Sequence, residues 1–158
     1  MDKKLMRLQL PGHWAICYNS FGDEEMIVAD GWIENQEHYK EDLLWLQSMR
    51  STKIPGISYE LDPAGWLADI GWYPDGDPNG AFTLHIFRLN PTEESWSVNP
   101  PMFSSRNRYY VRSVLEYVVN YIWHLNSEID IPRQQLERLQ LLHDQERLAE
   151  FLGSVGYL

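Results

Sequence analysis

The segment from Asp75 to Gly80 has the clearest metal-binding spacing in this chain. Its order, Asp-Gly-Asp-Pro-Asn-Gly, matches the first half of a calcium loop. Such a loop needs a carboxylate at its twelfth position to complete six to eight oxygen ligands, but Ile86 occupies that position. Asp, Asn, Pro and Gly are also the usual residues of tight turns. We therefore interpret the segment as a turn between two strands, and we predict no metal and no other cofactor.

The other acidic and nucleophilic side chains form no recognisable catalytic motif. Carboxylates are adjacent in pairs such as Glu24 and Glu25, whereas acid–base catalysis needs two such groups in different environments. No two of the five histidines have the i, i+4 spacing of a helical zinc pair. The only cysteine, Cys17, is expected to be a small buried residue. We predict that the protein is not an enzyme and has no catalytic residue.

The net charge of −10 lies almost entirely between Asp23 and Phe87. This stretch contains 13 acidic residues against Lys40, Arg50 and Lys53, and the charges of the segments on either side nearly cancel. A negative field over part of a surface attracts basic partners and repels polyanions. The pattern favours a basic macromolecule as partner and argues against nucleic acid, which is bound through clustered Lys and Arg.

The composition indicates one domain over residues 1–158, with 44% hydrophobic residues to form a core. A single cysteine cannot form an internal disulfide, which fits a reducing compartment. No apolar run approaches the ~20 residues that span a bilayer, and the N-terminus lacks the apolar centre of a secretory signal. We expect a cytoplasmic protein with no membrane partner.

The pattern of apolar residues predicts an α+β fold: an antiparallel sheet of about five strands packed against helices, with a helical C-terminal third. Segments 3–10 and 14–19 are expected to form a hairpin, and segment 24–33 is ambiguous between a strand and an irregular structure. A helix is predicted from Asn35 to about Arg50, because Tyr39, Leu43 and Leu46 keep a 3–4 spacing.

The second half of the chain is expected to pass from strands to helices. Segments 57–61, 66–72 and 81–89 predict a three-stranded antiparallel meander, followed by a loop over 90–105. The spacing of apolar residues predicts a helix over 107–125. A second helix is expected to start at Asp130 and reach about His143, and Asp144 is expected to cap a short last helix that ends at Gly153.

Acidic and aromatic residues share the predicted meander. Strand alternation places Trp66, Ala68, Ile70 and Trp72 on one face and Asp69 on the other. In protein interfaces, aromatic side chains provide contact area and charges provide orientation. The predicted partner-binding residues are Glu60, Asp62, Asp69, Trp72, Tyr73, Asp75 and Asp77.

Two segments of the chain resemble bacterial polymorphic-toxin immunity proteins. The first is Asp-Leu-Leu-Trp-Leu-Gln at 42–47, a helix in the family's pattern, followed by a strand and a turn in Ile-Ser-Tyr-Glu-Leu-Asp-Pro-Ala-Gly-Trp at 57–66. The second, at 71–82, resembles immunity proteins of contact-dependent growth inhibition systems, and together the similarity covers residues 42–89. The resemblance implies a small cytoplasmic protein that binds and neutralises one cognate toxin, often a nuclease. A nuclease binds phosphates through Lys and Arg, so the implied partner is basic.

Two alternatives from other classes remain open from the sequence. A small-ligand or carbohydrate-binding domain would use exposed tryptophans, of which the chain has seven, as stacking platforms. A hydrolase would hold two of the carboxylates within catalytic reach in one cleft.

Overall fold

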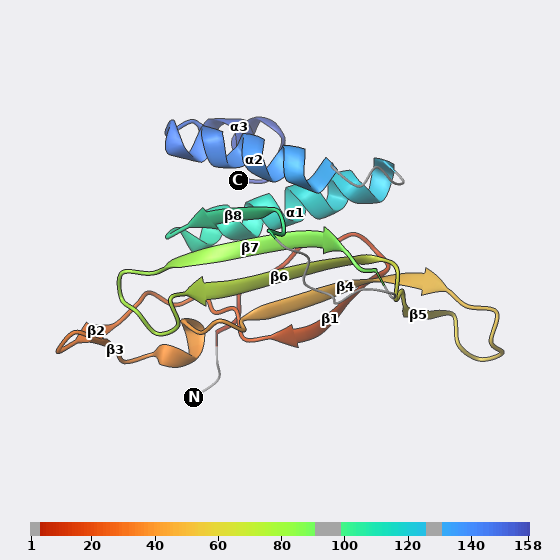
Figure 1. The fold of residues 1–158 in the computed structure, drawn as a ribbon, viewed down its shortest axis with the longest axis horizontal. Coiled ribbons are helices and arrows are strands. Elements are labelled where there is room, and N and C mark those ends of the chain that lie inside the picture. Colours follow the sequence, from red (N-terminus) through yellow and green to blue (C-terminus); the bar gives the residue numbers. More distant parts are fainter. Residues whose placement is uncertain (1–3, 91–98, 126–130) are drawn as a thin grey trace.

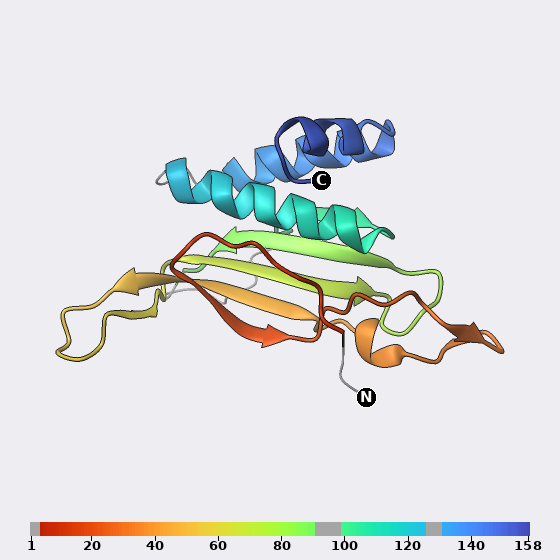
Figure 2. The ribbon, with the colours of Figure 1, turned by 180° about the vertical axis from the view of Figure 1, so that it is seen from behind.

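The computed structural model describes residues 4–90, 99–125 and 131–158. In this part of the chain, three helices cover one face of an antiparallel sheet (Figures 1 and 2). The helices are α1 (Arg108–Leu125), α2 (Ile131–Asp144) and α3 (Leu148–Ser154). The predicted α+β class with a helical C-terminal third is therefore confirmed.

The sheet has the strand order β1-β4-β6-β7-β8, and β5 pairs with the end of β4. The strands are β1 (Trp14–Asn19), β4 (Leu44–Ser51), β5 (Tyr59–Leu61), β6 (Trp66–Tyr73), β7 (Ala81–Arg88) and β8 (Met102–Ser105). A separate hairpin of β2 (Val28–Ala29) and β3 (Trp32–Ile33) projects from one end of the molecule (Figure 1). Because β6 is the central strand, its side chains occupy the middle of both faces of the sheet.

Alternation along the central strands directs one apolar set toward the helices. Ala68, Ile70 and Trp72 of β6 are at most 1% exposed and belong to one core with Val114 and Leu115 of α1. Burying an aliphatic side chain of this size stabilises the fold by about 1.5–3 kcal/mol. The opposite side of the sheet, which we call the outer face, carries the alternate residues.

The helix predicted from Asn35 to Arg50 is wrong. Only a 3-10 helix at Gln36–His38 forms there, and Leu44–Ser51 is strand β4, between β1 and β6. Tyr39, Leu43 and Leu46 happen to keep a helical spacing. A strand buried in a sheet can be apolar on both faces, and periodicity alone does not distinguish such a run from a helix. Pairing of β4 on both edges outweighed its local helical pattern.

The predicted N-terminal hairpin is also wrong. Within residues 4–13 the only strand-like pairing is an isolated bridge between Leu5 and Gly22, and β1 pairs with β4 instead. The register of β1 shifts between Ile16 and Tyr18, so Cys17 is the extra residue of a bulge. Cys17 is exposed there, contrary to the expectation that it is buried.

The meander consists of different strands from those predicted. Segment 57–61 contributes β5, which pairs with β4 and not with β6. The third strand beside β6 and β7 is β8, which lies inside the predicted 90–105 loop, although residues 91–98 are outside the described part of the chain. The meander therefore consists of β6, β7 and β8, and helices α1 and α2 contact its last two strands.

All three helices predicted for the C-terminal part of the chain are present in the structure. Helix α1 starts one residue after the predicted position and ends at Leu125 as expected. Helix α2 ends at Asp144, close to His143, and the predicted start at Asp130 is outside the described residues. The N-cap position of helix α3 is Arg147 and not Asp144, and no side chain caps it; the chain between the two residues turns through Glu146, which has a positive φ of 58°.

Candidate functional site

The seven predicted partner-binding residues do not form one patch. Glu60 is on β5 and Asp62 follows it, at one end of β6, whereas Asp75 and Asp77 lie in the β6–β7 turn at the other end. A strand of eight residues such as β6 separates its ends by roughly 23 Å, at about 3.3 Å per residue. The Glu60 carboxylate is paired with Arg50 at 3.0 Å.

Trp72 is a core residue, which corrects its prediction as a surface anchor. It is 1% exposed and makes edge-on contacts with Tyr39 and Phe82. Its indole Nε1 donates a hydrogen bond to the backbone oxygen of Asp77 at 2.8 Å. The alternation that placed Trp72 opposite Asp69 is correct, but its face is the one that the helices cover.

Two of the predicted carboxylates stabilise turns. Asp62 Oδ1 accepts a hydrogen bond from the backbone N–H of Ala64 at 3.0 Å. Asp77 Oδ1 accepts one from the backbone N–H of Asn79 at 2.8 Å. This is the local geometry that Asp gives a tight turn, in agreement with interpreting 75–80 as a turn.

Acidic side chains gather at the end of the sheet that carries the β2–β3 hairpin. The β6–β7 turn contacts the segment before β4: Glu41 N–H donates to Asp75 Oδ1 at 3.1 Å, and Gly76 N–H donates to the Tyr39 backbone oxygen at 2.9 Å. We call this region the acidic end, and its members are Asp23, Glu24, Glu25, Asp30, Glu34, Glu37, Glu41, Asp42, Asp75 and Asp77.

Only part of the acidic end is neutralised within the molecule. Arg108 pairs with Glu25 at 2.9 Å and with Asp23 at 3.4 Å, and Lys4 pairs with Asp23 at 3.5 Å. A hydrogen bond from Tyr109 holds the pKa of Asp23 below its ordinary value. Among the described residues, six members make no ion pair: Asp30, Glu34, Glu41, Asp42, Asp75 and Asp77. The negative charge of these six carboxylates is therefore not cancelled by a neighbouring cation in the described part of the chain.

The β2–β3 hairpin adds exposed apolar area to the acidic end. Trp32 is 70% exposed, and Ile27 and Val28 are each at least half exposed. The next residue, Ile33, is 1% exposed and anchors the hairpin in the core. The hairpin turn is Asp30-Gly31, both with positive φ (52° and 79°), as a two-residue turn requires.

Asn35 fixes the base of this hairpin. Its Nδ2 donates to the Glu25 backbone oxygen at 2.8 Å, and its Oδ1 accepts from the Ile27 N–H at 3.0 Å. The backbone N–H of Glu34 also donates to the Ile27 oxygen at 2.7 Å. These hydrogen bonds fix the base of the hairpin that carries the exposed Trp32.

Sequence reasoning missed this hairpin, although a signal for it exists. The order Val-Ala-Asp-Gly-Trp-Ile at 28–33 places Asp-Gly between two apolar pairs, which is the strongest short-range signal of a two-residue hairpin. The acidic charge of the region was recognised, but Trp32 was not assigned to the site.

The outer face continues from the acidic end along β4 and β6. Asp69 is 9% exposed there, and its register partners are Trp45 on β4 and His85 on β7. Burial, and then the nearby Asp42 carboxylate, raise the pKa of Asp69 from 3.8 to about 7. Tyr73 is 36% exposed, and burial, followed by the charges of Asp69, Glu41 and Asp42, raises its pKa to about 12.

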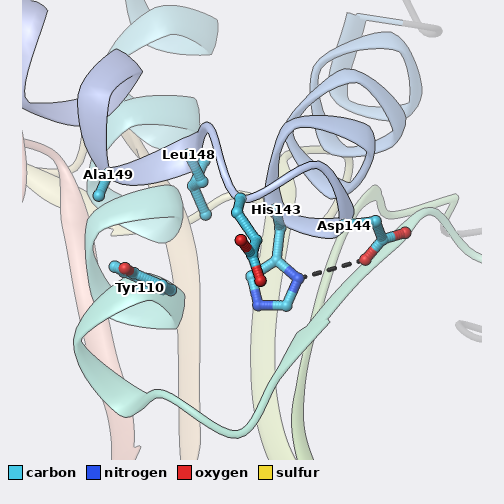
Figure 3. A pocket seen from close by; sticks show the side chains of 6 residues that line it. Tyr110, His143, Asp144, Leu148 and Ala149 are labelled. Atoms are coloured by element: carbon cyan, nitrogen blue, oxygen red, sulfur yellow. Dashed lines mark hydrogen bonds and ion pairs between the residues drawn. The ribbon is translucent and has the colours of Figure 1, made fainter.

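Serine, histidine and aspartate side chains also meet beside α2. His143 Nε2 lies 2.9 Å from Ser105 Oγ, and its Nδ1 lies 3.2 Å from Asp144 Oδ1. The adjoining cavity of about 560 Å³ is lined by Tyr110, His143, Asp144, Glu146, Leu148 and Ala149 (Figure 3).

These contacts follow the order of a Ser-His-Asp triad, but the serine does not line the cavity. Ser105 is 4% exposed, is not among the lining residues, and its Oγ accepts the backbone N–H of Asn107 at 3.0 Å at the start of α1. The hydrogen bond with His143 holds the pKa of Asp144 below its ordinary value, so this carboxylate is ionised near neutral pH. The interactions join α2 to β8 and α1.

Within the described residues, no group of three or more His, Cys, Asp or Glu side chains is placed to hold a metal ion. In the same part of the chain, no helix has both the length and the apolar character needed to cross a membrane. Comparisons with protein-family models, with curated proteins and with solved structures found no match to this chain.

Proposed function

We propose that this protein is an immunity protein that binds and neutralises a basic bacterial toxin domain, most simply a nuclease, in the cytoplasm. The observation that carries the proposal is the coincidence of the acidic end with the exposed Trp32 on a braced hairpin. The resemblance of residues 57–66 and 71–82 to immunity proteins supports the same class, whereas the helix of that pattern at 42–47 is replaced here by the start of strand β4.

The acidic end has the charge that such a partner requires. A nuclease binds phosphates through Lys and Arg. A surface with unpaired carboxylates can therefore bind in the same basic cleft or beside it. Complementary fields also raise the association rate above the ordinary 10⁵–10⁷ M⁻¹s⁻¹ of proteins. Fast capture matters because a toxin acts catalytically and an inhibitor acts one molecule at a time.

The hairpin supplies the apolar part of the interface. Interfaces obtain most of their binding energy from a few large side chains, Trp above all, surrounded by polar groups. Trp32, with Ile27 and Val28 near it, is such a group, and the same hairpin carries Asp30 in its turn and Glu34 directly after β3. The alternative of a carbohydrate-binding domain has less support, because Trp32 stands on a projecting hairpin and the cavity beside His143 is lined by no tryptophan.

The function is tested by co-expression with the toxin domain that the neighbouring upstream reading frame is expected to encode. We expect the toxin domain alone to stop growth and co-expression of this chain to restore it, with the two proteins eluting as one complex. A catalytically dead toxin domain should bind equally well, because inhibition needs no turnover. Growth arrest that this chain does not relieve, in cells where both proteins accumulate, contradicts the proposal.

A further inference from the structure

One carboxylate of the outer face is largely buried and has no partner among the described residues. Asp69 lies in the middle of β6 and is 9% exposed. Within the described residues it accepts no hydrogen bond and makes no ion pair; burial and the charge of Asp42 are what act on it. A buried carboxylate is normally paired, because the lost hydration costs several kcal/mol. Asp69 is therefore a mostly buried carboxylate that a cation could pair with.

Two aromatic residues, Trp45 and Tyr73, lie on the same face of the sheet as this carboxylate. Trp45 is the register partner of Asp69 on β4 and is 45% exposed. Cross-strand side chains of this kind have Cβ atoms about 4.5–5.5 Å apart. Along β6, the Tyr73 ring lies back over Gly71, since a Cβ on Gly71 would come within 2.8 Å of Tyr73 Cε2. The glycine lets the ring approach the strand on the side of Asp69.

The groups around Asp69 leave the site negative. Asp42 precedes β4, Glu41 accepts the Tyr73 hydroxyl on its backbone oxygen at 3.5 Å, and both carboxylates belong to the acidic end. On β7, His85 faces Asp69, and burial lowers the pKa of His85 against the opposing effect of a hydrogen bond with the Pro101 backbone. His85 is therefore mainly neutral near pH 7, and it does not replace a cation.

We propose that Asp69, Trp45 and Tyr73 form a binding site for one arginine side chain of the basic partner. The planar guanidinium can stack on an aromatic ring and donate two hydrogen bonds to one carboxylate, which a lysine cannot do. The proposal rests on the proposed function, since it names the chemical group that the toxin places on the outer face. It extends the interface from the acidic end onto the middle of the sheet.

Binding at this site is coupled to a proton. Asp69 is about half protonated near pH 7, and a bound guanidinium favours its ionised form. Arginine binding should therefore release about half a proton at pH 7, and it should be about tenfold tighter at pH 8 than at pH 6.

The site is tested with octa-arginine and octa-lysine peptides as probes, by calorimetry at pH 6, 7 and 8 in two buffers of different ionisation enthalpy. We expect octa-arginine to bind more tightly than octa-lysine, with the proton release given above. Asp69→Asn should weaken octa-arginine binding at least tenfold at pH 8 and abolish the proton release. Trp45→Ala should weaken it while the proton release remains. Glu60→Gln, at the far end of β6, is the matched control and should change neither quantity.

The outcomes separate this inference from the proposed function. Unchanged affinity and proton release in Asp69→Asn would overturn the arginine site, and so would equal binding of octa-lysine or no binding of either peptide. If lysine substitutions at the acidic end abolish peptide binding while Asp69→Asn does not, the arginine site fails and the acidic interface stands. If Asp69→Asn behaves as expected but the chain does not protect against the neighbouring toxin domain, the proposed function fails alone.

Discussion

Replacing Asp69 by asparagine is expected to make the free protein more stable, and increasingly so as the pH rises. The folded pKa of Asp69, about 7, lies above the unfolded value of 3.8, so its ionisation opposes folding. Stability is therefore lost from the parent as the pH rises through 7, and the variant avoids that loss. We expect the difference in free energy of unfolding to grow by about 2 kcal/mol between pH 5.5 and pH 8.5.

Denaturant unfolding at four or five pH values in that range measures this difference. The pH slope is the informative quantity, because a constant offset between the two proteins would include the packing of the new amide. Glu60→Gln is the control: its carboxylate is paired with Arg50 on the surface, and its difference from the parent should stay flat. A flat difference for Asp69→Asn as well would show that Asp69 is not desolvated as described.

This gain in stability has a functional counterpart. A residue that destabilises the free protein and strengthens a complex is typical of a binding site, where evolution retains a group against its folding cost. Asp69→Asn should thus raise stability and lower affinity together. A residue with a merely structural role would change both in the same direction.

Replacing Trp32 by alanine is expected to weaken the complex with the toxin domain by about 30- to 1,000-fold, the range of a central interface tryptophan. The indole is 70% exposed in the free protein, so its removal takes away little packing there. Its free energy of unfolding should stay within about 0.5 kcal/mol of the parent. Titration of the purified toxin domain against the variant, followed by fluorescence or calorimetry, provides the affinity.

Leu141→Ala is the matched control for Trp32→Ala. Leu141 is 57% exposed on α2, which lies on the helical side of the sheet and away from the acidic end (Figure 1). Its removal should leave the affinity unchanged. Equal losses for the two variants would mean that the hairpin has no special part in binding, and no loss for Trp32→Ala would remove it from the interface.

The sequence predicted the helical third well because that part follows local rules. Helix α1 has one broad apolar face over five turns, and periodicity of this length is hard to produce by another structure. The faces of β6 were also predicted, since alternation in a strand depends only on the chain itself. The buried Trp72 and the outward Asp69 are direct results of that alternation.

The errors arose where partners in the sheet decide the structure. Strand β4 has neighbours on both edges, and no local pattern reports that Leu44 and Leu46 will meet β1 and β6. The same error placed the site in the wrong segment. With 35–50 assigned to a helix, the predicted partner-binding residues were confined to the meander, whereas the fold brings Asp75 next to Glu41 and leaves Glu60 at the far end.

The central claim, that the acidic end captures a basic toxin domain, is tested most directly by association rates. The variant Glu34→Lys, Glu37→Lys, Glu41→Lys is compared with Glu60→Lys, Glu137→Lys, Glu150→Lys, which changes the net charge equally but away from the acidic end. At low salt, we predict that the first variant associates with the toxin domain at least tenfold more slowly and with a weaker salt dependence. The second should remain within about twofold of the parent. Equal slowing of both variants, or of neither, would contradict the account.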